Sequence, residues 1–398
     1  MKDVPLKPSR GSHPPPSLQP RSYLRAFTRR VLSMLLYLAL LLSQGSDARQ
    51  NGLNFLDDEW SPFAYNTPQA TQELKILRSQ TNADWICLTF CWYQWNITST
   101  SIYPKPGVSA NDSALTSIVN TAHAMGIKVM VRPLVDPDWS NPVNDHGIWR
   151  GDIGLNFTTV EWAAWFASYN AYVWHFAALS ERIGADEFCV GGELVTAAHQ
   201  TVYWTTTIAG VRERYKGPIL YSANHGNEVT MHLVQFWSLV DFIAVDAYYP
   251  LLPLNAAPSV AQLEQAWAPV VLGLRELSLR YNKKVIFAEV GYCSVPGANV
   301  NKMVALVTGI ADVVNNTAQA DCYQALLNVF YTLDWFEGVF WWAWTTNPSD
   351  TGPNSTGYTP QSKPAATILS QFYSAGTGLD APRSDETQES RAALNPVV

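Results

Sequence analysis

The sequence of 398 residues lacks the short motifs that mark several large enzyme classes. Its seven histidines show no His-Glu-x-x-His pattern or other spacing typical of a metal site. It contains no Gly-x-Ser-x-Gly elbow and no P-loop. These absences argue against a metalloenzyme, an elbow-type serine hydrolase and a P-loop nucleotide hydrolase, and they leave chemistry carried by carboxylates.

Charged residues are also few, at 15% of the chain, and their balance is acidic. The formal net charge is -7, but residues 1–48 are basic, so the rest of the chain carries about -12. An acidic body argues against a nucleic-acid partner, so we expect none. The sequence is rich in rings instead, with 16 Trp and 18 Tyr, which fill cores and also stack on sugars in clefts.

No stable membrane span is expected, because the apolar runs are short. The longest, Val31–Leu42, follows several arginines and precedes Ser46 and Ala48, which have the spacing of a cleavage site. We expect residues 1–48 to be a signal peptide with a basic, Pro-rich start; a type II membrane anchor is the alternative. Five Asn-x-Ser/Thr sequons agree with a secreted, extracellular glycoprotein: Asn96, Asn111, Asn156, Asn315 and Asn354.

The five cysteines define no disulfide framework. Cys87 and Cys91 lie on one predicted strand, about 13 Å apart along it, which is beyond disulfide reach. Cys189 also lies in an apolar strand and is expected in the core. Pairing of Cys293 with Cys322 stays open.

From residue 51 onward, short apolar runs alternate with longer helical patterns, as in βαβ units. Eight such runs predict a single (β/α)8 barrel over residues 49–376, followed by a disordered tail over 377–398. An open doubly wound sheet agrees less well with the sequence, because no glycine-rich turn follows the first apolar run. The predicted strands are 52–56, 84–90, 128–133, 187–191, 218–222, 242–246, 285–289 and 338–344.

Two of these runs lead into a glutamate: Glu193 follows strand four after Gly192, and Glu289 is the last residue of strand seven. A carboxylate at the end of a buried strand is costly unless it has a task or a partner. One such residue could simply form a structural ion pair. Two at matching strand ends fit the cleavage of a glycosidic bond, which needs one protonated and one ionised carboxyl group.

The other strand ends supply further candidates, because chemistry in such barrels lies at the carboxyl ends of the strands. Strict alternation places Glu193 on one face with Cys189 and Gly191, and Glu289 on one face with Val285 and Phe287. The glycines beside Glu193 are then expected to leave room for substrate. Tyr248 could contact Glu289 or fill core, and Trp342 and Trp344 are expected to share a face lining the cleft. The candidate substrate-binding residues are Trp92, Arg132, Asp136, Asn224, Asp246, Tyr248, Trp342 and Trp344.

Several pieces of the chain, in order, resemble glycoside hydrolase family 113, TIM-barrel enzymes that include retaining endo-β-1,4-mannanases. The resemblance covers about residues 51–373. It rests on Gly52–Asn54, Ala122–Gly126, Val190–Leu194, Val211–Gly217, Tyr221–Asn224, Asp241–Tyr248, Phe287–Tyr292 and Phe340–Trp344.

The resemblance implies that Glu193 is the acid/base, that Glu289 is the nucleophile, and that no metal or organic cofactor takes part. Gly192 stands where the larger clan has an asparagine before the acid/base, and Asn224 is the candidate to replace it at the sugar 2-hydroxyl. Arg132 stands where bacterial relatives are expected to have lysine, which leaves the substrate preference open.

We therefore expect a secreted, monomeric, retaining hydrolase of β-1,4-mannosidic bonds in mannan or glucomannan, with a polysaccharide or oligosaccharide substrate. Two alternatives remain. Another retaining β-glycanase, acting on β-glucan, would use the same glutamates. A carbohydrate-binding barrel without turnover is the third possibility.

Overall fold

The computed structural model describes seven stretches of the chain: residues 49–57, 61–141, 148–226, 233–253, 257–300, 312–347 and 351–375. The chain divides into two units, residues 1–48 and 49–398, and all of these stretches belong to the second. The expected signal peptide and the expected disordered tail lie outside the described residues, so both stay predictions.

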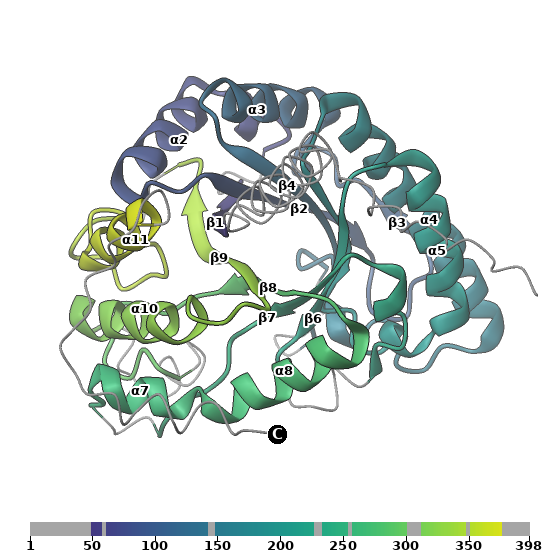
Figure 1. Ribbon diagram of the computed structural model, residues 1–398. Helices are drawn as coiled ribbons and strands as arrows, with labels where there is room; N and C mark the ends of the chain where they lie inside the picture. Colours follow the sequence, from purple (N-terminus) through teal and green to yellow (C-terminus); the bar gives the residue numbers. More distant parts are fainter. Residues whose placement is uncertain are drawn as a thin grey trace, which may run out of the picture. The chain divides into compact units, whose positions relative to one another are not determined.

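Eight parallel strands close into a barrel, as predicted (Figure 1). The order around the sheet is β1-β9-β8-β7-β6-β5-β4-β2, and pairing of β1 with β2 completes the ring. A two-residue strand, β3 (Ile102–Tyr103), pairs antiparallel with the end of β2 and was not predicted. The barrel strands are β1 (Gln50–Leu56), β2 (Trp85–Gln94), β4 (Lys128–Pro137), β5 (Glu187–Gly192), β6 (Ile219–Asn224), β7 (Phe242–Asp246), β8 (Val285–Val290) and β9 (Phe336–Thr345).

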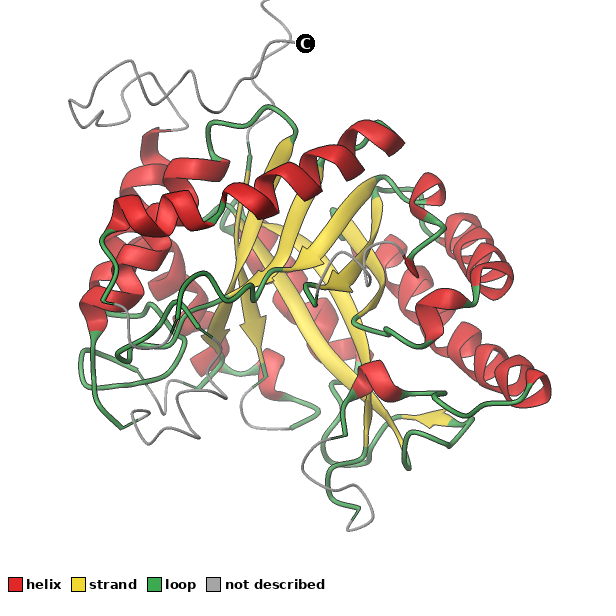
Figure 2. Ribbon diagram, turned by 90° about the horizontal axis from the view of Figure 1, so that it is seen from below, coloured by secondary structure: helices red, strands yellow, loops and turns green. Residues whose placement is uncertain are grey.

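Helices surround the barrel, and their ends follow local capping chemistry (Figure 2). Thr158 forms a capping box with Glu161 at the start of α4, and Gly184, with φ of 71°, ends that helix. The helices α7 and α8 meet at Trp267, and the side chain of Thr67 caps the start of α2. The helices are α2 (Pro68–Thr81), α3 (Asp112–Ala124), α4 (Thr159–Ile183), α5 (Thr201–Arg214), α7 (Val260–Ala266), α8 (Ala268–Tyr281), α10 (Asn316–Phe330) and α11 (Pro364–Ala375).

Two apolar layers stabilise this arrangement. A large cluster lies between strands and helices, and a smaller one consists of side chains that fill the barrel interior. Within the interior, the ring of Phe340 occupies the space above Gly52, where a Cβ would lie 2.3 Å from the ring. Among the described residues, no helix is both long and apolar enough to cross a bilayer. The interior cluster comprises Trp85, Cys87, Met130, Cys189, Leu220, Ala244, Ile286, Ala288 and Phe340.

The strict alternation of side chains breaks near the carboxyl ends of several strands. The register shifts between Cys189 and Gly192 on β5, between Phe287 and Val290 on β8, and opposite Leu53–Phe55 on β9. Such bulges redirect the side chains that follow them. The expectation that Glu289 lies on the same face as Val285 and Phe287 is therefore wrong. Val285 and Phe287 pack toward the helices, whereas Ala288, just before Glu289, points into the barrel.

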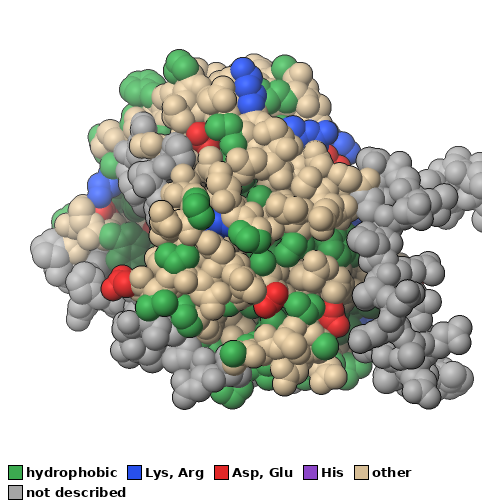
Figure 3. All heavy atoms as spheres, turned by 90° about the vertical axis from the view of Figure 1, so that its left-hand side faces the viewer, with side chains coloured by type: hydrophobic (Ala, Val, Ile, Leu, Met, Phe, Trp, Pro, Cys, Tyr) green, Lys and Arg blue, Asp and Glu red, His purple; other side chains and the backbone are tan. Residues whose placement is uncertain are grey.

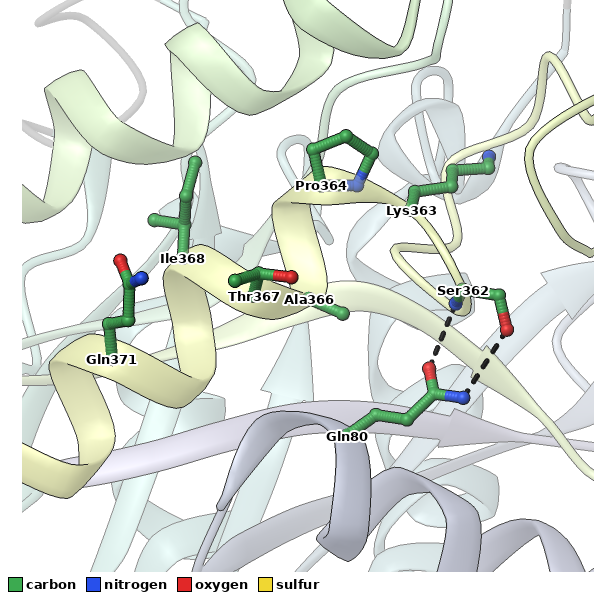
Figure 4. A pocket seen from close by; sticks show the side chains of 8 residues that line it. All are labelled: Gln80, Ser362, Lys363, Pro364, Ala366, Thr367, Ile368 and Gln371. Carbon is green, nitrogen blue, oxygen red and sulfur yellow. Dashed lines mark hydrogen bonds between the residues drawn. The ribbon is translucent and has the colours of Figure 1, made fainter.

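The helical face on the left of Figure 1 carries scattered charges of both signs among uncharged side chains (Figure 3). An open pocket lies on the outside of the barrel, where the start of α11 meets α2 (Figure 4). It is lined by residues such as Gln80, Ser362 and Thr367, and Gln80 is hydrogen-bonded to Ser362. None of its lining residues is a strand-end candidate, so this pocket is separate from the site described below.

Glu187, at the amino end of β5, allows a test of how a buried carboxyl group affects the stability of the fold. It is 2% exposed, its Oε1 accepts a hydrogen bond from Gln50, and burial raises its pKa to about 8. Because the folded state holds this proton more tightly than the unfolded state, stability falls as pH rises from about 4.5 to about 8. Glu187→Gln should not lose stability in this way. Relative to the wild type, its free energy of unfolding should be higher by roughly 2–4 kcal/mol above pH 8, and by less than about 1 kcal/mol near pH 5. Urea unfolding at both pH values measures this, and a difference independent of pH would contradict it.

Candidate active site

The Glu289 carboxylate is held from two sides at the end of β8. Arg132 donates to Oε1, and the hydroxyl of Tyr248 donates to Oε2 over 2.8 Å. Burial and the neighbouring Glu289 charge raise the pKa of Tyr248 well above its usual value, so its hydroxyl stays protonated and donates. Glu289 itself is only 5% exposed. A carboxylate that accepts a hydrogen bond from a cation on one oxygen and from a phenol on the other is fixed in direction.

Arg132 belongs to a buried chain of charges that ends on Glu289. Its second terminal nitrogen donates to Asp246 over 2.7 Å, and Ser222 donates to the other oxygen of Asp246. Burial alone would lower the pKa of Arg132, but Asp246 and Glu289 more than offset it, so the guanidinium stays charged. Arg132 and Asp246 are both 0% exposed. The expectation that they contact substrate is therefore wrong; they orient the nucleophile candidate.

Glu193 follows the bulge of β5 and has a left-handed backbone, with φ of 55°. Asn224, from β6, donates to its Oε1 over 3.0 Å, and the side chain is 14% exposed. Burial raises the pKa of Glu193, the charge of Glu289 raises it further, and Arg150, Arg132 and Asn224 oppose the rise. The charge of Glu289 thus acts on Glu193, and the two glutamates have different surroundings, as an acid and a nucleophile need.

Asp136 was expected to contact substrate, but the structure pairs it with Arg150. Nε and Nη2 of Arg150 donate to its two oxygens over 2.8 and 2.9 Å. Nη1 of the same guanidinium lies 3.7 Å from Oε2 of Glu193. Arg150 was not among the sequence candidates, because it follows no strand directly; it lies on the short helix η2 (Arg150–Asp152).

Comparison with known proteins shows the family of this chain. The family model described as Glycoside Hydrolase Family 113 matches residues 61–363. The chain belongs to glycoside hydrolase family 113. A search of curated proteins returned no match.

Solved structures of family 113 share the fold of this chain. A β-mannanase named AaManA, from Alicyclobacillus acidocaldarius in complex with ManMIm, is 28% identical with a TM-score of 0.70, over 83% of this chain and 99% of that one. The complex structure of a GH113 β-1,4-mannanase is 24% identical with a TM-score of 0.68, over 82% of this chain and 99% of that one. A β-glucuronidase from Ruminococcus gnavus is 12% identical with a TM-score of 0.54, over 82% of this chain and 50% of that one.

Two of the rings expected in the cleft of this family 113 enzyme point elsewhere. Trp344 is 0% exposed, and its indole nitrogen donates to Glu73 of α2 over 3.1 Å. Trp92 packs against Tyr172 and Phe176 of α4. Both expectations are wrong: the bulge turns Trp344 outward, and alternation from the inward Trp85 sends Trp92 to the helices.

Trp342 is partly exposed at the carboxyl end of β9 and stays a candidate. Its backbone lies beside Gly291, where an added Cβ would be 2.6 Å from the Trp342 carbonyl oxygen. Gly291 therefore allows the two strand ends to approach closely. Asn54 ties the same region together, donating to the carbonyls of Ala288 and Phe340 over 2.9 and 3.2 Å.

The glycines before Glu193 make room for protein side chains and not for substrate, contrary to expectation. A Cβ on Gly191 would lie 2.6 Å from the Tyr169 hydroxyl and 2.9 Å from Trp204. One on Gly192 would lie 3.0 Å from Arg132. The glycines thus let the outer rings and the buried arginine pack against the strand that carries the acid/base candidate.

Gly191→Ala should therefore destabilise the family 113 barrel by about 1–3 kcal/mol through overpacking against Tyr169 and Trp204. Gly273→Ala is the matched control. It lies on α8 with nothing within 4 Å of the added Cβ, and it should add about 0.5–1 kcal/mol through helix propensity. Thermal unfolding of both variants measures the difference. Equal midpoints would show that the space at Gly191 is not filled.

Proposed function

We propose that this family 113 glycoside hydrolase cleaves β-1,4-mannosidic bonds with retention, by double displacement. The solved family 113 β-mannanases that are 24–28% identical to this chain support the substrate class. One observation carries the mechanism. Arg132 and Tyr248 donate hydrogen bonds to the two oxygens of Glu289, while burial and the charge of Glu289 raise the pKa of Glu193.

In the first step Glu289 attacks the anomeric carbon and forms a glycosyl ester. The bond from that carbon to the leaving oxygen breaks, and the proton of Glu193 passes to this oxygen. Arg132 and Tyr248 keep the attacking carboxylate aligned, and Asn224 fixes the direction of Glu193. The cleaved chain then leaves with the proton as a free hydroxyl.

In the second step water attacks the same carbon and releases Glu289. Ester formation has removed the Glu289 charge, which was one cause of the raised pKa of Glu193. Glu193 is therefore a stronger acid in the ester than in the free enzyme, remains ionised after giving up its proton, and accepts one from water. Two displacements on opposite faces give net retention.

The test measures reducing-sugar release from β-mannan, glucomannan and β-glucan, with the anomeric configuration of the first product read by proton NMR. Release from mannan with a β-anomer appearing first supports the proposal. A first-formed α-anomer would exclude double displacement. Release from β-glucan alone would move the substrate to another β-glycan, and binding without any release would favour a non-catalytic carbohydrate-binding barrel.

We also propose secretion, on the basis of the apolar segment Val31–Leu42 and the five sequons. Expression of the full chain in a eukaryotic secretory host tests this. The expected result is protein in the medium that begins near Arg49 and loses mass on treatment with a peptide-N-glycosidase. Retention in the membrane fraction with an intact amino terminus would instead indicate a type II anchor.

A further inference from the structure

Arg150 is held rigidly by a partner that is not itself catalytic. Its guanidinium uses two nitrogens for the bidentate pair with Asp136 on β4, and its side chain is only 16% exposed. Asp136 receives a further contact from the Cys91 thiol, 3.2 Å from Oδ2. A bidentate pair of this kind fixes the plane of the guanidinium, and so it fixes where the third nitrogen points. That nitrogen lies 3.7 Å from Oε2 of Glu193.

The backbone joins the same two residues. The carbonyl of Gly151, next to Arg150, accepts hydrogen bonds from the backbone nitrogen and the hydroxyl of Thr196 over 3.0 and 2.7 Å. Thr196 lies three residues after Glu193. The turn that carries Arg150 is thus attached to the segment that follows Glu193, and the distance between the two side chains is maintained from both ends.

We propose that Arg150 is a positioning residue that holds Glu193 as an anion during the second displacement, so that Glu193 can accept the proton of the attacking water. This inference rests on the double displacement proposed above. Asp136 acts through Arg150, because it sets the position of the cation and takes no part in the proton transfer.

The charges around Glu193 explain why a cation is needed there. Groups from four elements act on its charge: Glu289 on β8, Arg132 on β4, Arg150 on η2, and the Asn224 amide on β6. Asp246 on β7 and Tyr221 on β6 also interact with its charge. In the free enzyme, burial and Glu289 favour the protonated acid. In the glycosyl ester the Glu289 charge is gone, while Arg150 and Arg132 remain to oppose the effect of burial.

Removal of the Arg150 charge should leave the first half-reaction intact and slow the second. The experiment uses an aryl β-mannoside with a 2,4-dinitrophenolate leaving group, whose departure needs no acid and whose turnover is limited by hydrolysis of the ester. For this substrate kcat rises with pH as Glu193 in the ester ionises. In Arg150→Gln this rise of kcat, the acid limb of the pH profile, should lie about one pH unit higher. At pH values on the acid limb, kcat should therefore be roughly tenfold lower than in the wild type.

Three further variants separate charge from structure. Arg150→Lys keeps a cation, so its acid limb should lie close to that of the wild type. Asp136→Asn loosens Arg150, so its acid limb should lie between those of the wild type and Arg150→Gln. Arg212→Gln, which breaks the exposed pair between Arg212 and Asp241, should change nothing. Azide, which attacks the ester without a general base, should accelerate Arg150→Gln more than the wild type.

An unshifted limb in both Arg150→Gln and Asp136→Asn would overturn the inference, as would a uniform loss of kcat at every pH without azide rescue. If Arg150→Gln is not recovered in folded form, Asp136→Asn and Arg150→Lys carry the same comparison. A wild type that fails to release dinitrophenolate with retention contradicts the proposed function instead, so the two failures are distinguishable.

Discussion

Glu289→Ala is expected to lower kcat on mannan by at least about 10⁴-fold, the largest effect of any single change in this chain. In the proposed double displacement, the substitution removes the atom that forms the covalent bond to the sugar. Arg132 keeps its contact with Asp246, so the buried charges stay partly paired and the barrel should remain folded. Release of reducing sugar from mannan, with circular dichroism as the check on folding, measures the effect.

A small anion offers the decisive control for this variant. The space left by the carboxylate, beside Arg132 and Tyr248, should admit formate or azide, which would attack the anomeric carbon from the side that Glu289 occupied. Cleavage of a dinitrophenyl β-mannoside with azide should then give an α-mannosyl azide, the inverted product. More than a tenth of wild-type activity in Glu289→Ala without any added anion would exclude Glu289 as the nucleophile.

The barrel was predictable from the sequence because its strands are buried on both faces. Runs such as Ile86–Leu88, Val129–Val131 and Val285–Phe287 read as continuous apolar segments, and parallel strands between helices produce such runs. Strand positions were therefore right to within a few residues. The two glutamates stood out as site candidates for a related reason. Each carboxylate interrupts or ends a buried apolar run, where a charge is costly unless it has a partner or a function.

The direction of side chains at the strand ends was not predictable in the same way. Alternation gives the correct face only while the register holds, and here it shifts on β5, β8 and β9. The shift turns Trp344 toward Glu73 and brings Gly191 against the outer rings. A bulge leaves little mark on the sequence, because the residues on either side of it are equally buried.

The electrostatic partners of the site also needed the structure. Arg132 and Asp246 are far apart in the chain, and only the barrel brings the buried guanidinium between two carboxylates. Their residue types indicated a polar site, but the sequence alone gave no reason to place them out of contact with substrate. Arg150 had no such signal, since its position depends on where the turn after β4 meets the segment after Glu193.

Glu193→Gln should separate the two uses of this carboxyl group by leaving-group chemistry. On mannan, whose leaving hydroxyl needs a proton, kcat/KM should fall about 10³–10⁴-fold. On a dinitrophenyl β-mannoside, the first step should slow by no more than about tenfold, and a burst of dinitrophenolate should precede slow turnover. Glu187→Gln, at the opposite end of the same strand, is the matched control and should keep wild-type rates on both substrates.

The pH dependence gives this prediction its sign. In the proposed mechanism, kcat/KM of the wild type on mannan depends on protonated Glu193. The rate should therefore fall as pH rises through a pKa that burial and Glu289 hold above the usual glutamate value. Glu193→Gln has no proton to lose there, and its residual kcat/KM should lack this basic limb. Should the limb persist in Glu193→Gln, the acid that protonates the leaving oxygen would be another group. Equal losses on mannan and on the dinitrophenyl substrate would likewise place the defect in binding or folding and not in proton transfer.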